Sequence, residues 1–287
     1  MYNAWKNKYV VDNIEFCGNA ISARHSGFWF NKYKLLLDAG IQTNYQPEII
    51  CITHTHGDHI EKLTSIMIDI KTKPIIFVPY GMKNMVMDYL NSFFRLTVLD
   101  PDYVVDVTII ECSDNDEHII STNGTKLKIK MIKTYHSVPS IGYSFYEIRN
   151  KLKPEYRNKT KNEIRELCKN KVKISEEIDV PVFMYTGDTT NEVFLNKNIP
   201  WNEFKLIITE CTFINDLTYG NENANELADR NKHNSFEYIL PVIQKHKNVT
   251  FALCHWSTRY KTDDLKLFFK LKNIPNIIPI IDSHNCI

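Results

Sequence analysis

The residues of this chain best suited to chemistry lie in one short stretch, residues 53–59, which read T-H-T-H-G-D-H. Three imidazoles and one carboxylate belong to this stretch: His54, His56, Asp58 and His59. Neutral imidazole suits Zn²⁺, and mixed histidine and carboxylate sites suit zinc, manganese or iron. A single catalytic metal ion must keep one position open for water, so four such ligands exceed its needs. The spacing therefore indicates a hydrolase with two metal ions, rather than a chance cluster of histidines.

Apolar runs on either side of this stretch predict how it is held. Residues 34–40 and 48–53 are rich in Leu and Ile and predict two buried strands. Residues 60–68 predict the start of a helix. The histidines then occupy a loop between a strand end and a helix, where layered α/β proteins place their chemistry.

Three later segments repeat the pattern of a buried strand that ends in a metal-binding residue. They are residues 132–143 with His136, residues 182–189 with Asp188, and residues 250–257 with His255. One such residue alone is more often structural. Three in succession, all downstream of the histidine-rich loop, indicate further ligands of the same site.

The H-x-H-x-D-H spacing after an apolar strand resembles the metallo-β-lactamase superfamily. The resemblance implies an α/β fold, a four-layer αββα sandwich with two sheets face to face and helices outside. It also implies two divalent metals, most simply Zn²⁺, with Mn²⁺ or Fe²⁺ also suited to these ligands. One metal would take His54, His56 and His136, the other Asp58, His59 and His255, and Asp188 would bridge them. A bridging Asp, in place of cysteine, is similar to the phosphodiesterase and thioesterase branches.

Further motifs resemble one branch, ribonuclease Z, the nuclease that trims the 3′ trailer from precursor tRNA. Residues 206–213 resemble its E-A-T-F element, with Cys211 in place of Ala, and residues 233–235 stand where it has His-Ser-Thr. Residues 255–260 match its H-x-S-x-R-Y ending, and residues 136–143 match H-x-x-P-x-x-G-Y. The resemblance runs from about residue 12 to about residue 282.

This resemblance implies roles for three residues. Phosphodiester hydrolysis needs a nucleophile at neutral pH and neutralised charge in the transition state, and two metals supply both. Asp58 is expected to accept the proton of the attacking water while it holds a metal. His233 is expected to protonate the leaving 3′ oxygen, with Glu210 orienting its imidazole. Taken without the family pattern, Glu210 is a strand-end carboxylate and His233 a solvated loop residue. Asp38, at a strand end below the motif, is expected to orient a ligand histidine.

The segment of residues 149–179 departs from many ribonucleases Z, which carry a long Gly- and Pro-containing arm there that grips the tRNA elbow. This segment has no glycine, and it predicts a short linker followed by a helix from about residue 160 to about residue 171, with Thr160 as N-cap. Residues 149–173 hold ten Lys or Arg and three acids, a net charge of +7 in a chain of net charge +1. Such a segment can bind an RNA backbone, or it can be a solvated helix. The candidate RNA-binding residues are Lys151, Lys153, Arg157 and Lys159.

Composition sets the remaining bounds. A chain of 287 residues with 43% apolar content can build one large domain, with halves at about residues 1–140 and 180–287 and the basic insert projecting between them. Seven cysteines without paired spacing favour a reducing compartment, the cytoplasm or nucleus. No signal peptide and no apolar stretch of the ~20 residues that a membrane span needs is visible. Homodimers are common in the resembling family, but no interface can be identified from the sequence.

Three classes of function stay open at this point. The first is a metal-dependent endoribonuclease that acts on the 3′ trailer of precursor tRNA or on RNA more broadly. The second is a small-molecule hydrolase on the same fold, acting on a β-lactam, lactone, thioester or cyclic nucleotide. The missing arm favours this second class or a nuclease of relaxed specificity. The third is an inactive scaffold, which the complete set of seven ligands argues against.

Overall fold

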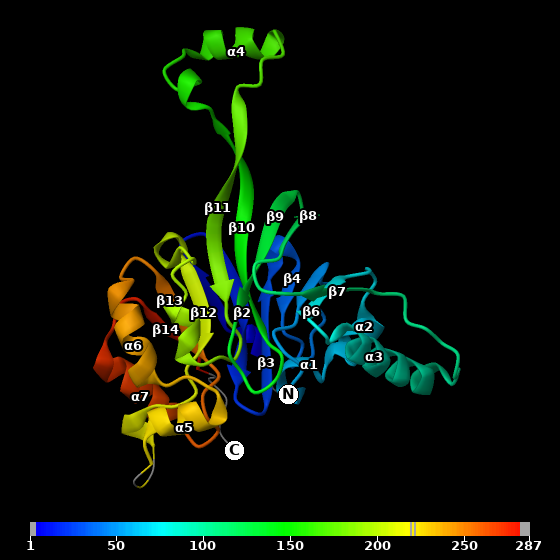
Figure 1. Ribbon diagram of the computed structural model, residues 1–287, viewed down its shortest axis with the longest axis vertical. Coiled ribbons are helices and arrows are strands. Elements are labelled where there is room, and N and C mark those ends of the chain that lie inside the picture. The colour runs from blue at the N-terminus through cyan, green and yellow to red at the C-terminus, as the bar shows by residue number, and fades with distance from the viewer. Residues whose placement is uncertain (1–3, 219, 221, 282–287) are drawn as a thin grey trace.

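The computed structural model describes residues 4–218, 220 and 222–281 (Figure 1). Its first sheet has seven strands that lie side by side in chain order. They are β1 (Lys8–Val11), β2 (Ile14–Ile21), β3 (His25–Phe30), β4 (Leu35–Leu37), β5 (Ile49–Cys51), β6 (Ile75–Pro79) and β7 (Thr108–Cys112). Neighbours from β1 to β4 are antiparallel, and neighbours from β4 to β7 are parallel. The predicted strands at residues 34–40 and 48–53 are confirmed as β4 and β5, both fully buried, as parallel strands covered on both faces should be.

The second sheet repeats this arrangement. Its strands are β8 (Glu117–Thr122), β9 (Thr125–Lys133), β10 (Ile141–Leu152), β11 (Ser175–Tyr185), β12 (Leu206–Glu210), β13 (Thr250–Cys254) and β14 (Ile277–Pro279). Neighbours from β8 to β11 are antiparallel, and neighbours from β11 to β14 are parallel. Each sheet therefore ends in four parallel strands, whose carboxyl ends can gather side chains at one edge.

The two sheets share one hydrophobic core between their facing sides. Phe30 of the first sheet stacks on Phe183 of the second with ring centroids 4.1 Å apart, and Phe145 stacks on Phe183 at 4.4 Å. Aromatic side chains bury large apolar areas, so this stack is a major source of sheet-to-sheet cohesion. The Tyr143 hydroxyl also donates a hydrogen bond to the Ile52 carbonyl oxygen at 2.6 Å, which ties the sheets together near the site.

Helices cover the two outer faces (Figure 1). The first sheet is covered by α1 (Gly57–Ile60), α2 (Leu63–Asp69) and α3 (Lys83–Val98), and the second by α5 (Ala224–Asn231), α6 (Phe236–Lys245) and α7 (Thr262–Lys272). Buried side chains such as Leu63 and Leu90 belong to the outer core of the first sheet, and Ile239 and Phe268 to that of the second. The predicted four-layer αββα sandwich is confirmed.

A long arm leaves the body of the molecule (Figure 1). β10 and β11 stay paired along their length, from Tyr143 opposite Tyr185 to Leu152 opposite Ser175, and α4 (Lys161–Lys169) lies at the tip. The predicted helix and its N-cap are confirmed, since Thr160 and Glu163 form a reciprocal capping box. The predicted short linker is wrong, because residues 149–152 continue β10 and the segment is a projecting ribbon.

The sheets divide between Cys112 and Glu117, earlier than the expected boundary near residue 140. The reason is that β9 pairs with β10 and β8 pairs with β9, so residues 117–133 join the second sheet. In the described part of the chain no helix is long and apolar enough to cross a membrane. The six cysteines described there are free, and Cys286 lies outside the described residues.

Candidate metal centre

All seven predicted metal ligands lie together at the edge where the parallel strands end. His54, His56, Asp58 and His59 follow β5, and His136, Asp188 and His255 follow β9, β11 and β13. Groups of three of these side chains, such as His54, His56 and His136, bring their donor atoms within 4.8 Å of one another. Residues more than 190 positions apart in the chain thus meet in one site.

Three imidazoles form the first group. The Nδ1 atom of His56 lies 3.1 Å from Nε2 of His54 and 3.2 Å from Nε2 of His136. A tetrahedral zinc ion with bonds of ~2.0–2.1 Å would place its ligand atoms roughly 3.3 Å apart, so this spacing fits an ion. The outer nitrogens are already used: Nδ1 of His54 lies 3.1 Å from the Thr53 hydroxyl, and Nδ1 of His136 donates to the Lys232 carbonyl oxygen at 2.7 Å.

The second group joins a carboxylate to two imidazoles. Oδ2 of Asp58 lies 3.3 Å from Nε2 of His255 and 3.6 Å from Nε2 of His59. One oxygen of Asp188, Oδ2, lies 3.3 Å from His255, 3.4 Å from His59 and 3.8 Å from His54. Asp188 therefore faces both groups, the position that a bridging carboxylate needs.

The ionisation of the site suits metal binding. Burial is the largest influence on the pKa values of His54, His56 and His136 and lowers all three, which favours the neutral imidazole that a metal requires. Burial raises the pKa of Asp188, but the surrounding histidines, His255 first, outweigh burial and hold that pKa well below its usual range. The first group thus offers neutral nitrogens and Asp188 an ionised oxygen, as divalent zinc, manganese or iron prefers. His59 differs: burial lowers its pKa, but the charges of Asp188 and Asp38 outweigh burial and raise that pKa, so a metal bound at His59 would displace a proton.

Asp38 orients the second group from beneath, as predicted. This fully buried carboxylate accepts a hydrogen bond from Nδ1 of His59 at 2.7 Å. It also accepts from the Thr53 backbone N–H at 2.7 Å and from the Tyr185 hydroxyl at 2.6 Å. Partners of this kind fix the tautomer and ring orientation of a ligand histidine.

Two glycines permit the close approach of chain segments at the site. A Cβ atom on Gly40 would lie 1.8 Å from the Asp58 carbonyl oxygen. Gly187 has a φ of +61°, and a Cβ there would lie 2.6 Å from Cβ of Thr53. Any side chain at either position would displace Asp58 or Asp188 from the cluster.

Glu210 and His233 stand next to the metal ligands. Nδ1 of His233 donates to Oε1 of Glu210 at 2.9 Å, and its ring lies 5.0 Å from that of His136 and 5.3 Å from that of His255. Burial lowers the pKa of His233, but the charge of Glu210 and its hydrogen bond outweigh burial and raise the pKa to about 9. The imidazole therefore keeps a proton at neutral pH beside the cluster.

Glu210 is itself held by partners that the sequence analysis missed. It accepts hydrogen bonds from the backbone N–H groups of Thr189 at 2.7 Å and Asn234 at 3.0 Å. The Thr212 hydroxyl donates to it at 2.5 Å and lies 3.1 Å from Nδ1 of His255. Thr212 thus links the candidate ligand His255 to the Glu210 and His233 pair. The threonine in the E-A-T-F resemblance was the available signal.

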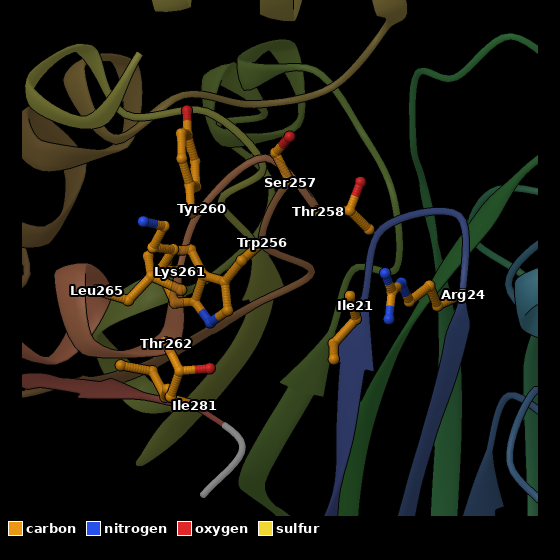
Figure 2. Close-up of a pocket in the computed structure, with 10 residues that line it drawn as sticks. All are labelled: Ile21, Arg24, Trp256, Ser257, Thr258, Tyr260, Lys261, Thr262, Leu265 and Ile281. Atoms are coloured by element: carbon orange, nitrogen blue, oxygen red, sulfur yellow. The ribbon is translucent and has the colours of Figure 1, made fainter. Parts of the chain in front are cut away.

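A pocket of about 210 Å³ lies beside the centre, next to the residues that follow His255 (Figure 2). Arg24 and Lys261 line it from opposite sides, and Ser257, Thr258 and Thr262 also line it. Both cations are exposed, and neither forms an ion pair with another residue that the structure describes. The Ala23 backbone N–H donates to Asp58 at 3.0 Å, so the turn that carries Arg24 lies against the metal ligands.

The four predicted RNA-binding residues belong to the arm and not to the centre. Lys151 lies in β10, and Lys153, Arg157 and Lys159 lie between β10 and α4. Lys159 forms an ion pair with Glu163 at 3.2 Å. The end of β10 and the segment before α4, which carry these cations, lie in the arm that projects from the two sheets (Figure 1).

Known proteins of similar sequence point to one branch of this fold. The chain is 29% identical over 268 residues to tRNase Z TRZ1 of Arabidopsis thaliana, which covers 91% of each chain. It is 26% identical to the chloroplastic tRNase Z TRZ2 of the same plant, over 83% of this chain and 66% of that protein. Ribonuclease Z of Clostridium perfringens is 26% identical over 79% of this chain and 81% of its own length. The chain is therefore similar in sequence to ribonucleases Z over most of its length.

Solved structures agree on the fold. The metallo-β-lactamase fold protein YhfI of Bacillus subtilis superposes with a TM-score of 0.56 at 15% identity, over 91% of this chain and 93% of its own. The short form of human tRNase Z superposes with a TM-score of 0.53 at 15% identity, over 92% and 94%. No protein-family model matches the chain. The resemblance inferred from the motifs is nevertheless confirmed by the ribonuclease Z-like relatives and by this fold.

Proposed function

We propose that this chain is a metal-dependent endoribonuclease that cleaves the 3′ trailer of precursor tRNA. One observation carries the proposal: buried Glu210 and half-buried His233 form a pair beside a cluster of seven candidate metal ligands. A hydrolase of small molecules on this fold would need the cluster but has no evident need for a positioned acid beside it. The names of the similar proteins, tRNase Z and ribonuclease Z, support the same substrate class.

The residues present fit two divalent ions. His54, His56 and His136 would hold one, Asp58, His59 and His255 the other, and Asp188 would serve both. When bound, two such ions supply a nucleophile at neutral pH and stabilise the charge of an in-line displacement. Zinc is the first choice for these ligands, with manganese or iron as alternatives.

Asp58 is proposed to accept the proton of the attacking water. Its Oδ2 atom faces His255, His59 and the Ala23 N–H, so its Oδ1 atom is the one left to receive the proton. Burial raises the pKa of Asp58, but the hydrogen bond from His255 and the charges of nearby histidines outweigh it and lower that pKa. The carboxylate is thus ionised and ready to accept.

His233 is proposed to give a proton to the leaving 3′ oxygen from Nε2. Its Nδ1 atom is committed to Glu210, which fixes the ring and leaves Nε2 as the remaining donor. Glu210 is anchored by Thr189, Thr212 and Asn234, so the imidazole cannot swing away from the cluster. This arrangement is a positioned acid held by a rigid carboxylate.

Two cationic regions are proposed to hold the RNA. Near the centre, Arg24 and Lys261 would contact phosphates on either side of the pocket of Figure 2. Farther out, Lys151, Lys153, Arg157 and Lys159 on the arm would contact the backbone of a folded RNA. An arm that extends from the body suits a large structured substrate better than a small molecule.

The test is cleavage of a labelled precursor tRNA with a 3′ trailer by the metal-loaded protein, beside an Asp58→Ala control. A single cut at the base of the acceptor stem, absent in the control, is expected. Scattered cuts would leave a nuclease of relaxed specificity. Absence of any cut, in protein shown to hold two metals, would overturn the proposal in favour of hydrolysis of a small ester or lactam.

The six free cysteines support a reducing compartment, the cytoplasm or nucleus, as the place of action.

A further inference from the structure

A second pocket, of about 340 Å³, lies beside the metal centre. It is lined by the candidate ligand His136 and, among others, by Pro139, Thr190, Glu192 and Lys232. We call it the His136 pocket. It shares no lining residue with the pocket of Figure 2, which adjoins the residues that follow His255. Its volume lies within the range of about 300–1,000 Å³ that ligand sites occupy. Each group of candidate metal ligands therefore has a pocket of its own beside it.

Two opposite charges line the His136 pocket without pairing. Glu192 belongs to a short 3₁₀ helix, Asn191–Leu195, and Lys232 is the C-cap residue of α5. Both are exposed, and neither forms an ion pair with another residue that the structure describes. An ionised carboxylate only accepts hydrogen bonds, and an ammonium group only donates them. A ligand that suits this pocket therefore carries a donor edge and, separately, an acceptor or an anionic group.

The rest of the lining suits a flat organic group. Tyr135, Val138 and Pro139 also line the pocket and give it apolar surface, and the face of a nucleobase packs well on such surface. Thr190 is 7% exposed, and its Oγ1 atom forms no hydrogen bond within the described part of the chain. Buried hydroxyl groups rarely lack a partner, and a ligand seated against this wall would supply one. Apolar walls with a few polar groups are typical of sites for small organic groups.

The proposed chemistry indicates which nucleotide of the RNA lies here, so the assignment rests on the proposed function. In an in-line displacement, the attacking water and the leaving 3′ oxygen lie on opposite sides of the phosphorus. Asp58, the proposed acceptor of the proton of the water, is bound by the Ala23 N–H, in the turn that also lines the pocket of Figure 2. Lys232 precedes the proposed acid His233, and its carbonyl oxygen accepts the hydrogen bond of His136. The His136 pocket therefore lies toward the leaving oxygen, next to the nucleotide that carries it.

We propose that the His136 pocket binds the base of the nucleotide immediately 5′ of the cut and favours guanine there. The two oxygens of the Glu192 carboxylate can accept two parallel hydrogen bonds. Guanine presents two adjacent N–H donors on its Watson–Crick edge, N1–H and N2–H, whereas each of the other three bases presents one donor group there. Lys232 would contact a phosphate of the same strand, which every base shares. Glu192 thus determines the specificity of the pocket, and Lys232 contributes to affinity for any sequence.

The first test measures binding of the four nucleoside 3′-monophosphates to the metal-loaded protein by calorimetry, because these carry a phosphate on the oxygen that leaves in the reaction. Guanosine 3′-monophosphate is expected to bind about tenfold more tightly than the other three, as a bidentate contact to a base allows. Glu192→Gln should remove most of this preference, because an amide offers one acceptor and one donor group. Lys232→Gln should weaken binding of all four about equally.

The matched control is Glu203→Gln, which changes an exposed carboxylate of another 3₁₀ helix, Trp201–Glu203, outside the pocket. It should bind all four compounds as the wild type does. Equal binding of the four, no binding of any, or a guanine preference that Glu192→Gln leaves intact would overturn the proposal.

The second test compares cleavage of four precursor tRNAs that differ only in the nucleotide 5′ of the cut. The wild type is expected to show kcat/KM about tenfold higher with guanine at that position, and Glu192→Gln should cleave the four at similar rates. Equal rates for the wild type would overturn this inference and leave the proposed function standing. Cleavage of none of the four, with the guanine preference in binding retained, would overturn the proposed function and leave the pocket as a guanine site.

Discussion

The metal centre and the tip of the arm are built on opposite principles. At the centre, His54, His59 and Asp188 are almost fully buried, and each is contacted by residues from distant parts of the chain. At the tip, α4 has no buried residue, and its side-chain contacts are local, such as Thr160 with Glu163 and Lys169 with Glu166. The candidate metal ligands are thus held by tertiary structure, whereas the proposed RNA-binding segment is held by local contacts. The two functions should therefore be separable by substitution.

The variant His233→Ala tests this comparison most strongly, because it removes the proposed proton donor and leaves the arm unchanged. If His233 is the proton donor, turnover on RNA should fall by about 10²–10⁴-fold, the usual contribution of a general acid. The metals should stay bound, because the seven predicted ligands do not include His233. The measurements are single-turnover cleavage of precursor tRNA and metal content by elemental analysis.

His118→Ala is the matched control for this variant. His118 lies in β8 and packs against Phe77 with ring centroids 5.1 Å apart, away from the candidate ligands. It should cleave as the wild type does. Unchanged turnover in His233→Ala would remove the acid role from His233 and leave Glu210 as an orienting group without a function in proton transfer.

Asp38→Asn tests whether metal affinity depends on the hydrogen bonds that the Asp38 carboxylate accepts. The carboxylate holds His59 at 2.7 Å and also accepts from Thr53 and Tyr185. Loss of such a partner of a metal-binding histidine typically costs about 10–100-fold in metal affinity or activity. Competition with a chelator gives the affinity, and Asp229→Asn, on the outer helix α5, is the control. Wild-type affinity in Asp38→Asn would mean that His59 is held by Asp58 and Asp188 alone.

The same contrast explains what the sequence could predict. The candidate ligands could be predicted because their residue types and short spacings are visible in the sequence, and each group of them follows a buried strand. The residues that orient these ligands could not all be predicted. Tyr185 and Asp38, for example, are 147 residues apart in the chain and become neighbours only when the sheets pack. The arm was missed for a different reason. Residues 149–152 and 175–179 form a ribbon with water on both faces, so they lack the apolar alternation that marks a strand.

Removing positive charge from the arm tests whether the arm binds RNA. Replacement of Lys151, Lys153, Arg157 and Lys159 by Ala should weaken RNA binding by roughly 10-fold or more at low salt and flatten its salt dependence, since fewer counterions are released. Hydrolysis of a small phosphodiester, which cannot reach the arm, should be unchanged. Binding is measured by titration at several salt concentrations.

A variant of equal charge loss is the control for the arm. Four exposed lysines outside the arm, Lys197, Lys245, Lys247 and Lys270, are replaced by Ala. If both variants lose RNA affinity equally, the effect is one of net charge, and the arm has no special role in binding.

The smallest expected effect concerns Glu147, where the arm meets the body. This buried carboxylate in β10 accepts hydrogen bonds from the Tyr33 hydroxyl at 2.7 Å, from Arg149 at 2.7 Å and from Lys32, so it ties the arm base to the first sheet. Burial raises the pKa of Glu147, but these three donors outweigh it and lower the pKa from 4.5 to about 2.

Glu147→Gln should therefore lower the free energy of unfolding by about 1–2 kcal/mol at neutral pH, a figure that allows for solvent screening of Lys32 and Arg149. Because the folded-state pKa is depressed, the wild-type advantage is fully present above about pH 4.5 and is lost as the pH falls toward 2. Denaturant unfolding at several pH values measures the difference, with the exposed Glu155→Gln as control. A difference independent of pH would show that Glu147 stabilises the arm base by packing and not by its charge.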